Sequence, residues 1–433
     1  MFKWSVFILR VPVAGQIVLK STLTGAVIKM NKGQLYEIEK WMEDPRVASA
    51  PCYIDDLLGQ NEFIVPFERD EFIDWKTSFM NAREDARIFT LHFLPTLKCQ
   101  FCCRYCFENG AERLSAMTNS TLDQSVVWLK RYFEIHNAVQ ILRVVLFGGE
   151  PLLEPQIIKR ALSEFEVLST VQKKQFAVRV TTNGELLNED MCKILRGHHW
   201  EKLQVTLDGP KSVHDARRFG KNHCQTFNTI ISNLEYVAAG DKPDVIDIRV
   251  TIDGENAETL PLLLEYLAHI DWREKIRLSI GFTTPFIGGT LVKANQNYIA
   301  ESALDFWGKA KSYGFRIPDE YIVGPWCVAI AKHSAVLQPN GALQKCFCTA
   351  GRDEYSFDVV SSSQNPSTRD SRFEQFERTD MCVKEQCPYL PICGGGCIHD
   401  ALVAYGQNGF RKRFCQKQQL KTINKGLIHI NYE

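Results

Sequence analysis

Residues 96–107 read Thr-Leu-Lys-Cys-Gln-Phe-Cys-Cys-Arg-Tyr-Cys-Phe and place three thiols, Cys99, Cys103 and Cys106, at intervals of four and three residues. Iron-sulfur clusters of the 4Fe-4S type are usually held by four cysteines. A loop that offers three cysteines leaves one iron without a protein ligand and open to a small chelating molecule. The spacing therefore predicts a catalytic cluster rather than one that only stores electrons.

The same run also contains two CxxC pairs, Cys99 with Cys102 and Cys103 with Cys106, which are ligands of the kind that zinc uses. Zinc sites normally separate such pairs by about a dozen residues or more, and adjoining pairs can hardly wrap one ion. We therefore favour the iron-sulfur interpretation and treat Cys102 as a bystander.

With the aromatic Tyr105 just before its last cysteine, the run resembles the signature of the radical S-adenosylmethionine (SAM) enzymes. The resemblance implies that the amino and carboxylate groups of SAM occupy the open iron. One-electron reduction then cleaves SAM to methionine and a 5′-deoxyadenosyl radical. An electron donor of the flavodoxin or ferredoxin type is implied as well.

The composition is that of an ordinary globular protein, with 433 residues, 45% of them hydrophobic, and 51 basic against 51 acidic side chains. Balanced charge gives no reason to expect nucleic acid as a partner, and no apolar stretch reaches the roughly 18 residues of a spanning helix. The apolar start breaks at Arg10-Val11-Pro12 without a clean cleavage site. We therefore expect a cytoplasmic protein with no membrane partner.

Fifteen cysteines in a long chain without a signal sequence indicate metal or redox sites rather than disulfides. Most of them are clustered. Cys52, Cys192 and Cys224 stand alone, and we expect these three to be small core residues.

Downstream of the cysteine run the chain repeats a unit of apolar strand, short turn and amphipathic helix. This pattern predicts parallel α/β architecture, here a partial (β/α)6 TIM barrel over residues 91–315, whose active residues gather at the carboxyl ends of the strands. The expected strands are His92–Leu97, Leu142–Phe147, Phe176–Thr181, Leu203–Leu207, Ile246–Ile252 and Arg277–Phe282. The expected helices are Thr121–His136, Pro155–Thr170, Gln225–Ala239 and Ala257–Ile270.

Polar motifs stand at the ends of these strands and also resemble the radical SAM family. They are the glycine-glycine-glutamate-proline run at 148–151, Thr-Thr-Asn-Gly at 181–184, and Thr-Leu-Asp-Gly-Pro at 206–210 with the arginines that follow. The residues that the resemblance assigns to cofactor binding are Tyr105, Gly148, Gly149, Glu150, Thr182, Asn183, Thr206, Arg217, Arg218 and Gly281. Glu150 and the two glycines are expected at the amino end of the methionine moiety, one of the two arginines at its carboxylate, and Gly281 at the adenine. His214 is expected to be structural.

The last third of the chain, residues 316–433, carries a second cysteine pattern that resembles the SPASM extension of radical SAM enzymes, which holds two auxiliary 4Fe-4S clusters. By this resemblance the first cluster is bound by Cys327, Cys346 and Cys397, and the second by Cys382, Cys387, Cys393 and Cys415. A hairpin over residues 335–343 brings Cys327 and Cys346 together. The first cluster lacks one ligand, so either Cys348 supplies it or the cluster has an open iron. The alternative for this segment is a zinc domain.

Residues 1–90 contain strand-like runs, Ser5–Val11, Ile17–Leu19 and Ala26–Met30, and two helical stretches, near Gly33–Met42 and from about Glu68 to Ala82. Similar appendages on peptide-modifying members of the family bind the leader of a precursor peptide by strand addition. A scaffolding cap on the barrel is the alternative.

The sequence thus predicts a radical SAM peptide maturase that uses SAM and three 4Fe-4S clusters to install a thioether or carbon-carbon crosslink in a ribosomally made precursor peptide. Alternatives are formylglycine formation on a protein, as in anaerobic sulfatase maturases, and radical oxidation of a small molecule. A non-catalytic cluster carrier and a zinc-binding interaction module belong to different classes.

Overall fold

The computed structural model describes residues 1–43, 58–108, 116–220, 225–282, 286–287, 290–291, 296–323 and 327–433, so Cys52 and Cys224 lie outside the described residues. The chain forms two compact units that are interleaved along the sequence. The barrel unit consists of Arg83–Ile317 and Cys327–Glu374, and the terminal unit of Met1–Ala82, Pro318–Trp326 and Gln375–Glu433. The functional division at residues 90 and 315 stays a prediction.

In the barrel unit, one sheet runs in the order β11-β10-β9-β8-β7-β6-β14-β15-β16 among the described residues. Six of its strands, from β6 to the edge strand β11, are parallel neighbours in sequence order: β6 (Ile88–Phe93), β7 (Ile141–Leu146), β8 (Gln175–Thr182), β9 (Trp200–Thr206), β10 (Val245–Ile252) and β11 (Ile276–Phe282). The predicted partial barrel is therefore confirmed.

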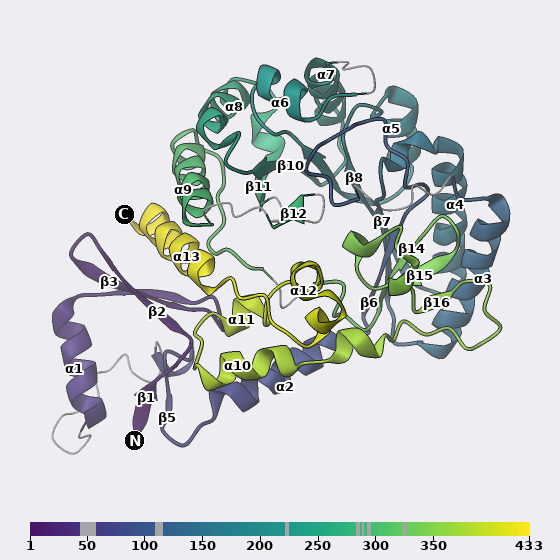
Figure 1. Ribbon diagram of the computed structural model, residues 1–433. Helices are drawn as coiled ribbons and strands as arrows, with labels where there is room; N and C mark the ends of the chain where they lie inside the picture. The colour runs from purple at the N-terminus through teal and green to yellow at the C-terminus, as the bar shows by residue number, and fades with distance from the viewer. Residues whose placement is uncertain are drawn as a thin grey trace. The chain divides into compact units, whose positions relative to one another are not determined.

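Helices cover the outer face of this sheet (Figure 1). They are α3 (Asn119–Ile135), α4 (Pro155–Val171), α5 (Glu189–Arg196), α6 (Lys211–Arg217), α7 (Phe227–Ala238), α8 (Leu260–Ala268) and α9 (Gln296–Ser312). Alternate strand residues, such as Val178 and Val180, are almost completely buried. This alternation follows from the strand period of two, which points every second side chain toward the helices.

The first barrel strand begins and ends four residues earlier than the sequence pattern predicts, because β6 spans Ile88–Phe93 rather than His92–Leu97. Pro95 lacks the N–H that would continue the ladder. Leu94 and Leu97 are nevertheless buried, since they pack with Val336 and Ala350 in a small core cluster. Their burial explains why the segment looks like a strand in the sequence.

The predicted hairpin after the barrel is present and joins the same sheet. β14 (Ser334–Leu337) runs parallel to β6 and antiparallel to β15 (Ala342–Gln344), which pairs with β16 (Asp358–Val359). Gly341 closes the turn with φ of 85°, a conformation that favours glycine. The sequence pattern did not predict that this hairpin extends the barrel sheet.

The terminal unit combines the two ends of the chain. Its three-stranded antiparallel sheet, β2 (Ile8–Val13), β3 (Gln16–Ser21) and β4 (Val27–Met30), packs against α1 (Lys32–Glu43) through a core that includes Leu19, Ile38 and Trp41. β1 (Phe2–Trp4) pairs with β5 (Ile64–Pro66), and α2 spans Glu71–Arg83.

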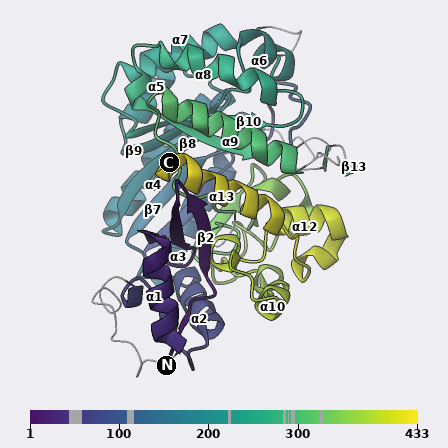
Figure 2. The ribbon, with the colours of Figure 1, turned by 90° about the vertical axis from the view of Figure 1, so that its left-hand side faces the viewer.

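The terminal unit also contains the helices α10 (Glu377–Lys384), α11 (Leu390–Cys393), α12 (Ile398–Tyr405) and α13 (Lys417–Tyr432), of which α10 and α11 carry one cysteine each. Figure 2 shows α13 beside the β2–β4 sheet. Lys29 of β4 donates to the carbonyl of Tyr432 at 2.8 Å, which joins the first and last segments.

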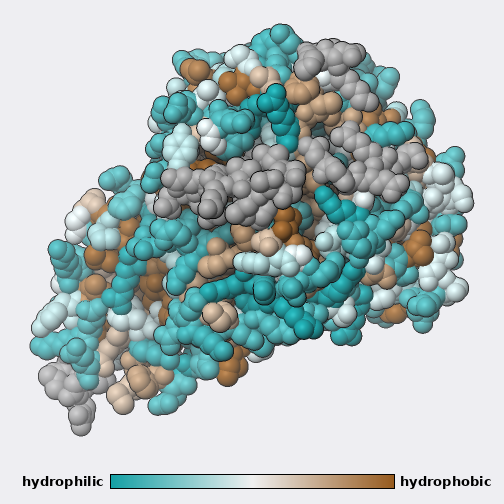
Figure 3. All heavy atoms as spheres, viewed as in Figure 1, coloured by the Kyte–Doolittle hydropathy of each residue, from teal (hydrophilic) through white to brown (hydrophobic). Residues whose placement is uncertain are grey.

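Surface hydropathy is mixed on the face drawn in Figure 3, where apolar residues lie in small groups among hydrophilic ones. Among the described residues, no helix has both the length and the apolar character needed to cross a bilayer.

Candidate active site

The cysteine loop, Cys99–Cys106, follows β6 and is held in place by backbone contacts. Phe101, which is 2% exposed, pairs with Gly220 as an isolated bridge. The Cys102 amide donates to the Phe219 carbonyl at 3.0 Å, while the Cys102 thiol is exposed. Cys99, Cys103 and Cys106 are half-buried, as expected for thiols that share one ligand. The bystander role of Cys102 agrees with this placement and stays a prediction.

Burial raises the pKa of each of the three thiols, that of Cys99 to about 12 and that of Cys106 to about 11. Without a bound cation these groups are therefore protonated at neutral pH. Thiolate ligation releases the protons, so assembly of a metal site and deprotonation of this loop are linked.

The two glycines after β7 lie directly against the cysteine loop. A Cβ on Gly148 would come within 2.4 Å of the Thr96 carbonyl oxygen, and one on Gly149 within 2.4 Å of that of Lys98. The Gly149 amide donates to Thr96 at 3.3 Å and the Glu150 amide to Lys98 at 2.8 Å. The absence of side chains therefore allows the end of β7 to support the loop that carries Cys99.

Glu150 is fully buried and joins the ends of β7 and β8. Its Oε1 accepts from the Thr182 hydroxyl at 2.7 Å and the Leu152 amide at 3.0 Å, and its Oε2 accepts from the Asn183 amide at 2.8 Å. Burial raises the pKa of Glu150 to about 7. A carboxylate offers about four acceptor positions, so three protein donors leave one for an ammonium group.

Asn183 connects this network to the cluster ligands, because its Nδ2 lies 4.0 Å from the Cys99 Sγ. The structure thus brings Glu150, Thr182 and Asn183 together beside Cys99. Their contact with SAM stays a prediction.

Tyr105 belongs to a buried polar network rather than an open surface. Its hydroxyl donates to the Asp208 carboxylate and accepts from Arg218 Nη1 at 2.5 Å. Arg217 lies over the Tyr105 ring and forms an ion pair of 2.6 Å with Asp253. Both arginines that were candidates for the SAM carboxylate are therefore already engaged by side chains of the protein.

His214 occupies a structural position, as expected. It is fully buried, its Nδ1 accepts from the Asp208 amide at 3.4 Å, and its Nε2 lies 3.3 Å from the Thr226 hydroxyl. Burial lowers the pKa of His214 to about 3, so the ring is neutral.

Gly281 lies against the side chain of Arg249. A Cβ there would lie 2.4 Å from Nη2 of Arg249, and the contact of Gly281 with the adenine stays a prediction. Arg249 is paired in register with Thr206 on the neighbouring strand.

The first auxiliary set is divided between the two units. Cys346 is buried and Cys327 is exposed in the barrel unit. The buried Lys345, next to Cys346 in the sequence, places its Nζ 2.6 Å from the Ala331 carbonyl. Phe347, between Cys346 and Cys348, stacks on His92 with ring centroids 5.3 Å apart. Cys397 belongs to the terminal unit, so the shared ligand set stays a prediction.

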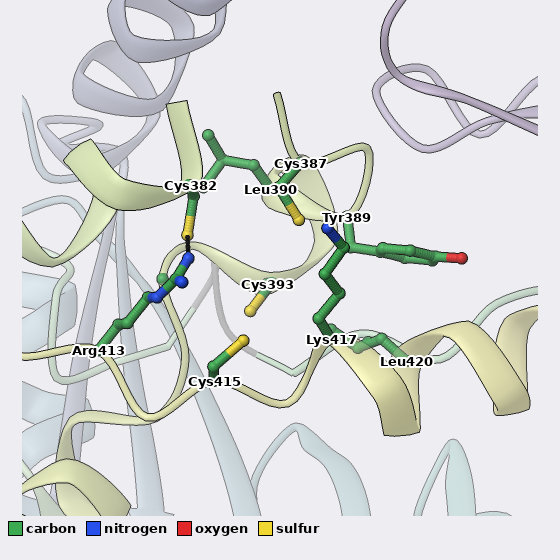
Figure 4. A pocket seen from close by; sticks show the side chains of 10 residues that line it. Cys382, Cys387, Tyr389, Leu390, Cys393, Arg413, Cys415, Lys417 and Leu420 are labelled. Carbon is green, nitrogen blue, oxygen red and sulfur yellow. Dashed lines mark hydrogen bonds between the residues drawn. The ribbon is translucent and has the colours of Figure 1, made fainter. Parts of the chain in front are cut away.

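The second auxiliary set comes together within the terminal unit. Cys382, Cys387, Cys393 and Cys415 line one pocket, and their sulfur atoms point toward one another (Figure 4). We call this site the four-cysteine pocket. Leu390, Leu420 and Tyr389 form its apolar wall.

Two local features shape the pocket. Gly394, the residue directly after α11, lies in the left-handed region, and a Cβ on Gly396 would lie 2.3 Å from the Phe414 carbonyl oxygen. The glycine run thus admits the backbone that precedes Cys415. Arg413 reaches the other side, where its Nη1 lies 3.3 Å from the Cys382 Sγ and its Nη2 lies 2.5 Å from Glu385.

The chemistry of the donor sets, thiols in groups of three and four, fits iron-sulfur clusters. Among the described residues, no three His, Cys, Asp or Glu side chains converge as closely as a single metal ion requires. A zinc ion holds its thiolates at about 2.3 Å, whereas a 4Fe-4S cluster separates its cysteine ligands by its own width. When bound at Cys99, Cys103 and Cys106, such a cluster would supply the electron that cleaves SAM.

The profile of the radical SAM superfamily matches residues 93–267 of this chain. These residues belong to the radical SAM superfamily. The match covers the cysteine loop and the ends of β7, β8 and β9. The radical SAM domain is therefore an enzyme domain that uses SAM and a 4Fe-4S cluster.

Relatives of known activity match mainly this radical SAM domain. A cysteine-type anaerobic sulfatase-maturating enzyme of Clostridium novyi is 29% identical over 140 residues, which are 32% of this chain and 36% of that enzyme. The chain thus spans about a third of its length. An uncharacterized protein of Archaeoglobus fulgidus is 26% identical over 401 residues, 85% of this chain and 89% of that protein.

Solved structures resemble the fold over a greater length. Native anSMEcpe with bound AdoMet and Kp18Cys peptide has a TM-score of 0.61 and 15% identity, and covers 79% of this chain and 97% of its own. Streptococcus suis SuiB bound to precursor peptide SuiA has a TM-score of 0.52 and 15% identity, and covers 96% and 100%. At these identities the likeness concerns the fold.

Replacing Gly149 by alanine is expected to disturb the cysteine loop of the radical SAM domain, because the new methyl group would overlap the Leu97 and Lys98 carbonyls. We expect the Gly149→Ala protein to bind less iron on anaerobic reconstitution, measured by iron and sulfide analysis. Gly308→Ala is the matched control, since Gly308 lies in α9 with open space around it. Equal iron binding by both variants would contradict the supporting role of Gly149.

Arg413 is a residue that the cysteine pattern did not reveal, although its place two residues before Cys415 is a usable signal. Its N–H and positive charge beside Cys382 should favour the reduced, more negative form of a cluster in the four-cysteine pocket. We expect Arg413→Gln to make the midpoint potential of that cluster more negative in a redox titration followed by electron paramagnetic resonance.

Lys412→Gln removes the same charge from the preceding residue, whose ammonium lies 5.4 Å from the Tyr405 ring centre. It should leave the potential unchanged. Equal shifts in the two variants would show a general charge effect instead of the Arg413 contact.

Proposed function

We propose that this chain is a radical SAM peptide maturase that installs a thioether or carbon-carbon crosslink in a ribosomally made precursor peptide. The observation that carries the proposal is the four-cysteine pocket in addition to the cysteine loop. A crosslink removes two hydrogens from the peptide. One leaves as a hydrogen atom, and the other as a proton and an electron, so the enzyme needs a second site that holds an electron acceptor.

The similar folds support a peptide as substrate. Both anSMEcpe and SuiB are described with a peptide bound, and the likeness to SuiB covers 96% of this chain. The antiparallel sheet β2-β3-β4 has two edge strands, and an extended leader peptide binds such an edge by adding a strand. We therefore assign leader binding to residues 1–90, three 4Fe-4S clusters to the chain, and electron supply to a flavodoxin or ferredoxin.

Formylglycine formation on a cysteine or serine is the second candidate. It is favoured by the 29% identity with the Clostridium novyi sulfatase-maturating enzyme over 140 residues. Both reactions are two-electron oxidations of the substrate. Oxidation of serine removes two hydrogens, and oxidation of cysteine also exchanges sulfur for an oxygen from water with release of hydrogen sulfide, so the structure of the product separates formylglycine from a crosslink.

The test is anaerobic incubation of the reconstituted protein with SAM, a reductant and each short peptide encoded beside its gene, followed by high-resolution mass analysis. We expect a peptide that has lost two hydrogens and whose fragment ions are missing between the joined residues. The Cys99→Ala protein is the control and should leave the peptide unchanged. Conversion of a sulfatase-derived peptide instead, with no change in the neighbouring peptides, would favour formylglycine formation.

A further inference from the structure

The inner face of the barrel sheet carries a row of charged side chains. On β10, Ile248, Val250 and Ile252 are fully buried on the face that the helices cover. Because strand side chains alternate, Arg249 lies on the opposite, inner face. Polar side chains of the neighbouring strands meet it there.

Most cations of this face are balanced by a carboxylate. Glu201 accepts from Arg143 at 2.9 Å and from Arg179 at 2.7 Å. Lys202 forms an ion pair with the buried Asp247. These contacts place a carboxylate beside each of the three cations on β7, β8 and β9, as partly buried charges require.

Arg249 differs from these cations. Its guanidinium lies over Gly281, within 2.4 Å of where a Cβ would be, and among the described residues it has no carboxylate partner and no hydrogen bond. Residues 283–295, which follow β11 in the sequence, include neither Asp nor Glu. A half-buried cation without a counter-ion is costly unless a ligand supplies one.

Two hydroxyl groups flank this guanidinium. In the parallel register, Arg249 lies between Thr206 on β9 and Ser279 on β11. The Ser279 hydroxyl oxygen is buried and has no hydrogen-bond partner in the described part of the chain. Gly281, two residues further along β11, leaves room for the guanidinium to turn toward the ends of the strands.

We propose that Arg249, Ser279 and Thr206 form a carboxylate-binding site on the inner face of the barrel. A guanidinium presents two parallel N–H groups that match the two oxygens of a carboxylate, and one positive charge balances one negative charge. The hydroxyls supply further donors for the same oxygens. The position is near the carboxyl ends of β9, β10 and β11, where ligands of such barrels bind.

Two ligands of this enzyme class carry a carboxylate, namely SAM and an acidic peptide substrate. The affinities of SAM and of N-acetyl-glutamate N-methylamide are therefore measured by anaerobic calorimetry on the reconstituted full-length protein. The neutral glutamine analogue of the second ligand is the reference compound. The variants are Arg249→Gln and Arg249→Lys. Arg277→Gln is the matched control, because Arg277 is an exposed arginine on β11, two residues from Ser279 on the same face.

We expect Arg249→Gln to lower the binding affinity for one of the two carboxylate ligands by about tenfold or more, because a charge-assisted contact is lost. Weaker SAM binding assigns the site to the cofactor, and weaker binding of the glutamate probe alone assigns it to the substrate. Arg249→Lys should retain part of the affinity, and Arg277→Gln all of it. Unchanged affinities for both ligands in folded Arg249→Gln protein would overturn the proposal. If that variant fails to fold, the same criterion applies to Arg249→Lys.

Discussion

Alanine at Cys99, Cys103 or Cys106 is expected to reduce SAM cleavage to the uncatalysed background. Each thiol is half-buried in the loop that the ends of β7 and β8 support, and Asn183 lies 4.0 Å from the Cys99 sulfur. A cluster that loses one of three protein ligands has two open irons and is not retained. The measurement is 5′-deoxyadenosine formed under anaerobic conditions with a chemical reductant, quantified by mass spectrometry.

Cys102→Ala provides the matched control within the same loop. The Cys102 thiol is exposed, and its backbone amide, which the substitution preserves, donates to the Phe219 carbonyl. Most of the cleavage activity and the cluster signal should therefore remain. If Cys102→Ala lost as much SAM cleavage as Cys103→Ala, this result would contradict the assignment of the cluster ligands.

The second large effect is expected from the four-cysteine pocket. Replacing Cys393 or Cys415 by alanine removes one of the four convergent sulfurs, so the iron content should fall by about a third if three clusters are present. SAM cleavage should continue, because the cysteine loop belongs to the other unit of the chain. Conversion of the peptide should stop. Iron content, 5′-deoxyadenosine and peptide mass are measured on the same sample.

Cys192→Ala is the control for these substitutions. Cys192 is fully buried in α5 and its sulfur lies 3.8 Å from the Leu187 carbonyl, as expected for a core residue. This variant should keep its iron and its activity at the cost of a small cavity. A fall in iron equal to that in Cys393→Ala would show that the loss reflects unfolding and not ligation.

Much of the barrel could be predicted from the sequence, because its strands and helices have periods that the chain displays directly. β7 to β11 and α3, α4 and α7 lie within about three residues of their predicted places, as expected for strongly periodic elements. β6 was misplaced because Leu94 and Leu97 are buried outside any strand. The joining of both chain ends in one unit could not be predicted, since no local pattern encodes such distant pairing.

The candidate site shows the same limit. Motifs revealed residues whose spacing is local, such as Glu150 and Asn183 at strand ends, and the structure brings them together. Arg249 and Arg413 were missed because their importance arises from neighbours that lie on other segments, Gly281 and Cys382. An arginine has no sequence signal that distinguishes a site from a solvated surface.

Hydrogen abstraction from a peptide is the central claim, and transfer of deuterium tests it most directly. The precursor peptide is synthesised with deuterium at the side chains of the candidate crosslink residues and incubated anaerobically with the protein, SAM and a reductant. We predict that 5′-deoxyadenosine gains one deuterium in proportion to the crosslinked peptide. Crosslinked peptide accompanied by unlabelled 5′-deoxyadenosine, whichever side chain carries the label, would contradict the account.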